Sequence, residues 1–278
     1  ITLPLPYFEE QQRIADFLDQ KTAEIDEAID KKQRLIELLE ERKAILINQA
    51  VTKGLNPDVP MKDSGVEWIG EIPEHWEVKK LKFISSVQSG LTLGKTYVGK
   101  HIKSYPYLRV ANVQFGFLNL DDVAKIKLPP RLAKQYMVQS GDILVTEGGD
   151  IDKLGRGTVW EGQINNCLHQ NHIFAIRVIK KVASEYFVSF SLEADNGRHY
   201  FTRTAKKTTN LASTNKSKLG NVPIPLPPLP EQVSIVNYVN EIGLRIDEIK
   251  ITVEKEINGM NELKQVIISE AVTGKIKI

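Results

Sequence analysis

The chain contains two copies of one proline-rich motif, "LPLPYFEEQQRIA" at residues 3–15 and "IPLPPLPEQVSIV" at residues 224–236. When the sequence is compared with itself at an offset of 221 residues, the two ends align without a gap. A gap-free match over about 55 residues indicates a structural repeat. The identities that close the alignment are Ala50, Val51 and Thr52 with Ala271, Val272 and Thr273.

Each copy is predicted to form an extended, proline-rich segment followed by one long helix. Prolines fix the backbone of the first part and cannot continue a strand ladder or a helix interior. The bodies that follow, about residues 9–51 and 231–272, contain no proline. They end near Gly54 and Gly274, which are typical helix-stop residues. At about 1.5 Å per residue, each helix would be about 65 Å long.

A row of mainly apolar residues with a spacing close to 3.5 runs along each body and is interrupted by polar residues, as in a coiled-coil seam. A long helix with one apolar stripe has to bury that stripe. We therefore expect the two copies to pair with each other as an antiparallel coiled coil, although a general oligomerisation coiled coil would show the same heptads. The two rows are Leu18, Thr22, Ile25, Ile29, Lys32, Ile36, Leu39, Lys43, Leu46 and Ala50, and Val239, Gly243, Ile246, Lys250, Val253, Ile257, Met260, Lys264, Ile267 and Ala271.

The segment between the two copies differs from them in charge. Residues 1–57 carry a net charge of −3, residues 58–221 carry +7 and residues 222–278 carry −2. A basic module between acidic helices indicates a polyanionic partner, usually nucleic acid. These three ranges are the predicted first helical region, globular domain and second helical region.

Composition excludes several other classes of protein. The single cysteine, Cys167, rules out an intramolecular disulfide and fits a reducing cytoplasm. No apolar run approaches the roughly 18 residues of a membrane span, and the first residues lack the order of a signal peptide. The chain begins at Ile1 without a methionine, which suggests a piece of a longer protein or a processed one.

The chain resembles the specificity (S) subunit of bacterial type I restriction–modification systems. The resemblance rests on "PLPPLPEQ" and its weaker copy "PLPYFEEQ", on "IDE" within each helix and on the helix ends "AVTK" and "AVTGK". It is reinforced by "GVEWIGEIPEHWEVKKLK" at residues 65–82, which is similar to the start of a target-recognition domain in that family.

The resemblance implies a DNA-recognition role without catalysis. In the family, two target-recognition domains alternate with two helical regions, and each domain reads one half of a split double-stranded DNA site. The helices set the spacing of the half-sites and dock methyltransferase subunits, and through these the restriction subunit. This chain has two helical regions but one recognition domain. It therefore resembles the C-terminal half of a full-length subunit or a half-length form, for which a homodimer through the helices is possible.

The middle domain is predicted to be α+β, mostly a curved sheet with short helices. Short β-branched and aromatic runs bounded by turn residues indicate strands at residues 105–113, 123–128, 141–149, 157–162 and 172–179. Residues 184–201 favour helix, because Phe187, Phe190 and Ser191 are spaced for one face.

The strongest candidate DNA-binding stretch is residues 197–220, which contains six cations and no acid. Cations can bind phosphates, and hydroxyl and amide groups can hydrogen-bond to phosphates or bases. A solvated loop would have the same composition. The candidates here are Arg198, Arg203, Lys206, Lys207, Asn210, Thr214, Asn215 and Lys216.

Two further stretches supply candidates. Residues 90–114 interleave basic and aromatic side chains, which suits a nucleic-acid face, although core packing is expected for Tyr107. In residues 147–157 a tight loop between strands is favoured over a metal or phosphate site. The resemblance implies that Arg156 and residues 169–171 lie near DNA. From residues 90–114, the composition gives Lys95, Lys100, His101, Lys103 and Arg109 as candidates, and the resemblance implies that Asn112 and Gln114, which follow a strand, also face DNA.

No established catalytic motif is present, so we predict no catalytic residue, cofactor or metal. "GLTLGKT" at residues 90–96 has three residues between its glycines, where a P-loop needs four. Cys167, His169 and His172 lack a fourth zinc ligand. The sequence thus predicts a DNA sequence-recognition subunit. The alternative is a coiled-coil scaffold that tethers nucleic acid without sequence choice.

Overall fold

The computed structural model describes residues 6–92, 94, 97, 101–151, 154–207 and 211–277. The chain divides into two compact units. The first consists of residues 1–45 with 240–278, and the second, the globular unit, consists of residues 46–239. None of the helices in the described part of the chain is long and apolar enough to cross a membrane.

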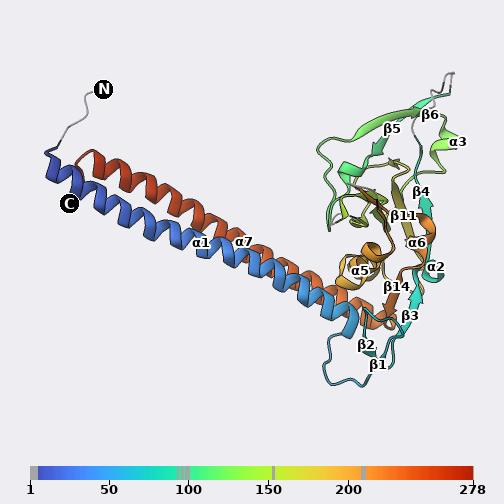
Figure 1. Ribbon diagram of the computed structural model, residues 1–278. Helices are drawn as coiled ribbons and strands as arrows, with labels where there is room; N and C mark the ends of the chain where they lie inside the picture. The colour runs from blue at the N-terminus through green and yellow to red at the C-terminus, as the bar shows by residue number, and fades with distance from the viewer. Residues whose placement is uncertain are drawn as a thin grey trace. The chain divides into compact units, whose positions relative to one another are not determined.

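Two long helices form the first unit, as the repeat predicts. Helix α1 spans Phe8–Lys53 and helix α7 spans Leu229–Val272, and their central parts lie side by side in opposite directions (Figure 1). The glycines that follow them, Gly54 and Gly274, have φ values of 75° and 72°. This left-handed conformation favours glycine and ends a helix, so the predicted stop residues are confirmed.

The predicted seam is the least exposed row of both helices. Every described seam position is buried or partly buried, and Ile29, Ile246 and Val253 are only 8%, 7% and 5% exposed. Neighbouring aliphatic residues on the outer faces, such as Leu38 and Ile251, are 46% and 52% exposed. The antiparallel coiled coil is therefore confirmed by burial.

The charged interruptions of the seam are four lysines, and each forms an ion pair with an acid on the opposite helix. Two of these pairs are repeats of each other, because Lys43 and Lys264 are equivalent in the 221-residue repeat, as are Asp26 and Asp247. The hydrogen bond that Lys250 Nζ donates to the Glu40 carboxylate raises the pKa of the Lys250 ammonium. Seam lysines that need an acid opposite them favour one register of the two helices. The pairs are Lys32–Glu256 at 2.6 Å, Lys43–Asp247 at 3.0 Å, Lys264–Asp26 at 2.5 Å and Lys250–Glu40.

The globular unit contains several small sheets rather than the single curved sheet that was predicted. The sheet with most strands among the described residues has the order β4-β11-β7-β9 and is antiparallel throughout. Three-stranded sheets have the orders β10-β5-β6 and β12-β13-β8, and β1 pairs with β2. The strands are β1 (Met61–Asp63), β2 (Glu71–Pro73), β4 (Ser85–Ser89), β5 (Lys103–Leu108), β6 (Ala124–Leu128), β7 (Asp142–Thr146), β8 (Gly148–Gly149), β9 (Gly157–Trp160), β10 (Leu168–His169), β11 (Ile173–Val178), β12 (Lys206–Lys207) and β13 (Ala212–Ser213).

Short helices connect and cover these sheets. The predicted helical stretch at 184–201 is confirmed, but it is two helices, α4 and α5, because Ala194 between them has extended backbone angles. The short elements are α2 (Leu81–Ile84), η1 (Val110–Asn112), α3 (Pro130–Ala133), α4 (Glu185–Glu193), α5 (Asp195–Thr204) and α6 (Lys216–Gly220).

The boundaries predicted for the globular domain, 57/58 and 221/222, both lie outside the long helices. The compact globular unit is larger than this prediction, because it also includes the last turns of α1 and the first turns of α7.

The proline-rich segment before α7 is a strand, which the sequence analysis excluded. Strand β14 (Pro223–Leu226) pairs antiparallel with β3 (Glu77–Lys80). The two prolines of β14 alternate with Ile224 and Leu226, and β14 has only one neighbour in its sheet. Successive N–H groups of a strand point to opposite sides, so both positions that lack an N–H face away from β3. Alternation therefore allows prolines in a strand that is paired on one side.

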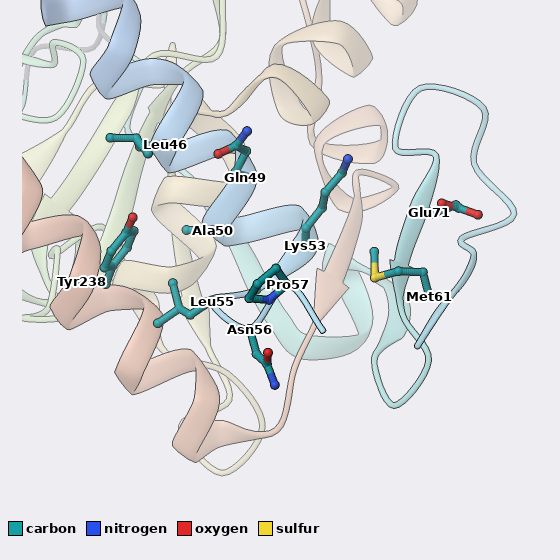
Figure 2. Close-up of a pocket in the computed structure, with 11 residues that line it drawn as sticks. Leu46, Gln49, Ala50, Lys53, Leu55, Asn56, Pro57, Met61, Glu71 and Tyr238 are labelled. Atoms are coloured by element: carbon teal, nitrogen blue, oxygen red, sulfur yellow. The ribbon is translucent and has the colours of Figure 1, made fainter. Parts of the chain in front are cut away.

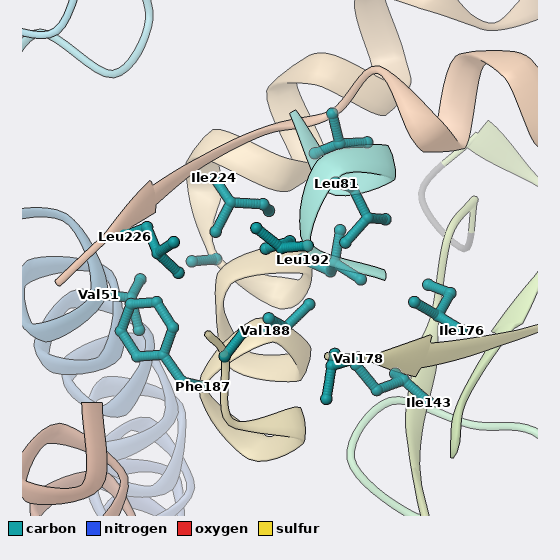
Figure 3. Packing of buried hydrophobic residues seen from close by; sticks show 14 of the residues in the cluster. Val51, Leu81, Ile143, Ile176, Val178, Phe187, Val188, Leu192, Ile224 and Leu226 are labelled. Atoms are coloured by element: carbon teal, nitrogen blue, oxygen red, sulfur yellow. The ribbon is translucent and has the colours of Figure 1, made fainter. Parts of the chain in front are cut away.

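The core of the globular unit includes the helix turns that enter it. Val51 of α1 and Ile235 of α7 are 0% exposed and belong to one cluster with Trp76, Phe187 and many residues of α4 and the sheets. Figure 3 shows Val51 and Phe187 close together, near Leu226 of β14. The rings of Trp76 and Phe187 meet edge-on at 6.5 Å, a favourable aromatic geometry. Both repeats thus supply one helix end to this core.

Gln232 fixes the start of α7 to the globular unit. Its side chain is fully buried and makes three hydrogen bonds. Nε2 donates to the carbonyls of Val182 and Pro227 at 3.1 and 2.8 Å, and Oε1 accepts from the backbone N–H of Ser184 at 2.8 Å. In the first repeat the equivalent residue, Gln11, is exposed, and its Nε2 donates to the Pro6 carbonyl at 2.7 Å.

We expect Gln232→Ala to lower the free energy of unfolding of the globular unit by about 2 kcal/mol, because buried backbone partners lose their hydrogen bonds. Urea unfolding followed by tryptophan fluorescence measures this, since all three tryptophans lie in the globular unit. Gln11→Ala is the matched control and should leave the transition midpoint unchanged. Equal effects of the two substitutions would contradict the anchoring role.

Candidate nucleic-acid interface

The predicted cationic stretch at 197–220 does not act as one loop in the structure. Its first part is helix α5, whose Tyr200 and Phe201 are 8% and 1% exposed and pack into the core. The two lysines of β12 follow, and β12 pairs with β13, which pairs with β8. Lys206 and Lys207 are exposed and form no ion pair with any residue that the structure describes. They are therefore available to a phosphate.

Arg156 lies beside Gln114, which comes from a distant part of the sequence. Its guanidinium donates to Gln114 Oε1 at 3.2 Å and to the Val110 carbonyl at 3.4 Å. The amide nitrogen of Gln114 in turn donates to the Ala111 carbonyl at 2.8 Å. Because the Gln114 amide is held at both ends, it positions the Arg156 guanidinium at this surface.

Two further predicted cations adjoin this group. The Arg198 guanidinium lies over the ring of Phe115 at 4.9 Å, next to Gln114 in the sequence. Lys206 lines the same hollow as Val110. Sequence reasoning did not identify Phe115, whose exposed ring holds Arg198 in place by a cation–π contact. We call Gln114, Arg156, Arg198 and Lys206 the cationic face.

A hollow of about 460 Å³ opens beside the cationic face. Gly148 and Gly149 line it together with Lys206. Gly149 has φ 150°, and a Cβ built on it would meet no atom of the described residues within 4 Å, so this part of the wall is open backbone. Open glycine backbone permits a ligand to approach closely.

An acid and a histidine form the polar wall of the hollow. His172 Nδ1 lies 2.6 Å from Glu147 Oε2, and the two side chains are 55% and 28% exposed. The Glu147 backbone is fixed as well, because its N–H donates to the His172 carbonyl and its carbonyl accepts from Thr214, both at 2.8 Å. Sequence reasoning named neither side chain as a site residue, since nothing local to residue 147 indicates a partner 25 residues further on.

Several predicted DNA contacts are structural instead. Asn112 is 4% exposed: Oδ1 accepts from the Arg109 N–H, and Nδ2 donates to the carbonyls of Asn119 and Asp122. Thr214 is also 4% exposed. The structure therefore removes Asn112 and Thr214 from the surface, because both are enclosed by loops that the sequence could not place.

Three other predicted residues are already engaged. Asn215 caps α6 by accepting from the Lys218 N–H at 2.9 Å. Arg203 pairs with Glu67 at 3.3 Å and lies over the Trp68 ring at 5.5 Å. Arg109 pairs with the exposed Asp122 at 2.7 Å. Their side chains can contact DNA only after exchanging these partners.

The remaining predicted residues do not join the cationic face. His101, Lys103 and Lys216 are exposed, and no contact links them to it within the described part of the chain. Lys95, Lys100 and Asn210 lie outside the described residues.

The other reactive or titratable residues that the sequence analysis considered are buried and have a packing role. Tyr107 is 2% exposed and donates to the Leu91 carbonyl at 2.8 Å, so core packing is confirmed, and burial raises its pKa to about 12. Burial also raises the pKa of the Cys167 thiol to about 12 and lowers that of the His169 imidazole. His169 Nδ1 lies 3.1 Å from the Tyr136 carbonyl. Cys167 and His169 are thus packing residues.

A separate hollow of about 490 Å³ lies where α1 ends. Figure 2 shows its lining residues coming from α1, from the loop after it, from the β1–β2 hairpin and from α7. Its walls mix apolar residues such as Leu46 and Met61 with Lys53 and Glu71. None of the predicted DNA-binding residues lines it, so it does not extend the cationic face.

Residues 73–259 match the family described as the type I restriction modification DNA specificity domain. The chain belongs to this family. The chain is 30% identical to the MjaVIII specificity subunit of Methanocaldococcus jannaschii over 287 residues. This alignment covers the whole chain and 63% of that protein. Its similarity to the EcoKI specificity subunit of Escherichia coli K12 is 24% identity, covering 99% of the chain and 58% of the relative. The chain therefore spans little more than half the length of these specificity subunits.

Solved structures show the same fold. One of them comes from a study of complex assembly and conformational transition in the type I R-M system. It aligns with 99% of the present chain and with 62% of its own length, with a TM-score of 0.70 and 18% sequence identity. The HsdS subunit of Thermoanaerobacter tengcongensis matches 99% of the chain and 60% of its own, with a TM-score of 0.51 and 18% identity. The globular unit and the helix pair thus share the fold of about 60% of each of these chains.

Proposed function

We propose that the globular unit binds one half-site of a bipartite double-stranded DNA target and selects its sequence. The observation that carries this proposal is the convergence of Gln114, Arg156, Arg198 and Lys206, from three distant segments, on one surface. Family membership supports the same role.

The cationic face combines the two kinds of contact that sequence recognition needs. Lysines and arginines that neutralise phosphates supply affinity but no sequence information. An arginine whose orientation is fixed can bind the O6 and N7 atoms of guanine, and each good bidentate contact gives about 1–3 kcal/mol of discrimination. Arg156, positioned by Gln114, suits base reading, and Lys206 and Lys207 on the edge strand β12 suit phosphate binding.

The helix pair sets the spacing of half-sites and docks methyltransferase subunits. Half-sites that are read from one face of DNA lie about one helical turn, ~34–36 Å, apart, which is within the reach of helices of this length. The ion-paired seam lysines give the pair one register and hence one length. Methyl transfer and cleavage then belong to partner subunits, with the restriction subunit reached through the methyltransferase, in the cytoplasm.

Recognition of both half-sites requires a second globular domain. Gln11 repeats the hydrogen bond of Gln232 to a proline carbonyl five residues earlier, and its side chain makes no other hydrogen bond among the described residues, so it can help to hold such a domain. In a chain with a single domain, a second copy paired through the helices supplies it.

Selection of bound duplexes from a randomised pool tests this function directly. An enriched sequence motif supports recognition, whereas binding without enrichment favours the scaffold that tethers nucleic acid non-specifically. Methyl-transfer and cleavage assays on the purified chain, with cofactor and magnesium, should show no activity. Turnover in either assay would contradict a purely recognising role.

We expect Lys206→Ala/Lys207→Ala to weaken binding to all duplexes by the same factor, because phosphate contacts do not depend on sequence. The slope of log K against log salt should become shallower by about 1.8, since each phosphate that a lysine no longer neutralises reduces the slope by about 0.9. Fluorescence anisotropy at several salt concentrations measures both quantities.

Lys125→Ala/Lys127→Ala is the matched control, since these two lysines are exposed on strand β6 of the same unit and form no ion pair with any described residue. It removes the same charge and should leave the slope closer to that of the unmodified chain. A loss of binding to one sequence only, in the Lys206/Lys207 variant, would contradict a phosphate-binding role.

A further inference from the structure

Glu147 is an acid beside a surface that otherwise attracts DNA. It lines the same hollow as Lys206, and Arg156 binds the carbonyl of Val110 on the wall of that hollow. A carboxylate repels phosphates, so in this position it lowers general affinity for DNA. Such a group can still form a favourable contact with DNA if it meets a hydrogen-bond donor on a base edge.

The Glu147 carboxylate is fixed through one of its oxygens, and the other oxygen can accept a hydrogen bond from a ligand. Oε2 is bound by His172 Nδ1 at 2.6 Å, and the backbone hydrogen bonds to His172 and Thr214 fix the residue on both sides. Oε1 has no hydrogen-bond partner among the residues that the structure describes. An ionised carboxylate is an acceptor only, so this oxygen can recognise a donor and nothing else.

The hollow beside Glu147 has room for the edge of a base pair. Its volume is about 460 Å³, and Gly149 presents open backbone to it. Val110 and Ala212 add apolar surface. In the major groove, cytosine N4 and adenine N6 are both amino donors. A carboxylate pairs with cytosine N4, because beside adenine N6 it would face the N7 acceptor, whereas glutamine recognises adenine by donating to N7 and accepting from N6.

We propose that Glu147 determines sequence specificity by accepting a hydrogen bond from a cytosine N4 amino group, with His172 as the residue that positions its carboxylate. This inference rests on the proposed function, because it assumes that the globular unit reads duplex DNA. It assigns one base choice to one side chain. Lys206, at the rim of the same hollow, binds a phosphate next to the base that is read.

The test compares motifs selected from a randomised duplex pool by the full chain and by its Glu147→Gln variant. We expect a single position of the motif to change from cytosine to adenine, with a preference of about tenfold, since glutamine can pair with adenine but an amide accepts less strongly from cytosine. All other positions should stay the same. His172→Ala should weaken the preference for cytosine at that same position.

Glu161→Gln is the matched control, because its carboxylate is likewise held by one side chain, the Tyr186 hydroxyl at 2.9 Å. It should reproduce the motif of the unmodified chain. If the unmodified chain enriches no motif, the proposed function itself fails. If it enriches a motif that Glu147→Gln leaves unchanged, or that this variant loses at every position while still folded, only the role of Glu147 is overturned. If Glu147→Gln does not fold, His172→Ala decides by the same criterion.

Discussion

Asp142→Ala is expected to lower the free energy of unfolding of the globular unit by about 3 kcal/mol, because Arg177 and the Gln139 N–H lose their hydrogen bonds to a charged carboxylate, and bonds to charged groups contribute more than neutral ones. Asp142 is 1% exposed, and its two oxygens accept from Arg177 at 2.7 Å each and from the Gln139 N–H at 2.8 Å. The pair joins β7 to β11, where Asp142 and Arg177 are directly opposite in register. The hydrogen bond also raises the pKa of the Arg177 guanidinium.

The matched control is Asp122→Ala. Asp122 pairs with Arg109 at the same distance of 2.7 Å, but its side chain is 85% exposed. Exposed pairs contribute about 0–1 kcal/mol, so this variant should unfold almost as the unmodified chain does. Urea unfolding followed by tryptophan fluorescence compares the two. Similar midpoints for both variants would show that burial of the Asp142 carboxylate does not strengthen the contribution of its ion pair to the free energy of unfolding.

Val253→Asp should disrupt the helix pair while the globular unit stays folded. Val253 is 5% exposed in the seam, so the substitution loses the burial of a valine and places a carboxylate in an apolar row. We expect a cost of about 3 kcal/mol, which exceeds what a two-helix unit can supply. The measurement is hydrogen exchange of amides in residues 8–45 and 240–272, which should become rapid. Tryptophan fluorescence should not change, because the helix pair contains no tryptophan.

Ile251→Asp controls for helix propensity and charge, because Ile251 is on the same helix but 52% exposed. Its amides should exchange as slowly as in the unmodified chain. Rapid exchange in both variants would indicate that the helices are held by something other than their seam. In the proposed role, loss of the helix pair would also abolish the fixed spacing between half-sites while single half-site binding persists.

The sequence predicted the helices well because their determinants are local. Apolar spacing, absence of proline and a terminal glycine are all properties of consecutive residues, and they gave helices within a few residues of Phe8–Lys53 and Leu229–Val272. The strands at 124–128, 142–146, 157–160 and 173–178 were also predicted, since β-branched runs between turns depend on neighbours in sequence. How strands group into sheets depends on distant pairings, and there the prediction of one curved sheet was wrong.

The candidate site could be predicted by residue type but not by role. Charge composition directed attention to Arg198 and Lys206, because an excess of cations is visible in a sequence, and the family resemblance added Arg156. The structure brings the three near one surface, and their contact with DNA stays a prediction. Asn112 and Asn215 have the side chains of DNA-contacting residues, yet one holds a loop together and the other caps a helix. From sequence alone, an asparagine side chain that hydrogen-bonds to the backbone cannot be distinguished from one that faces solvent.

By itself, the sequence determined that two equivalent helices flank a basic domain and that their apolar rows can meet. Only the tertiary structure decided which acid neutralises each seam lysine, that alternate prolines permit β14, and that Glu147 meets His172 beside the cationic face. The reason is physical: helix formation depends on residues a few positions apart, whereas an ion pair or a site depends on the distance between atoms that folding alone brings together.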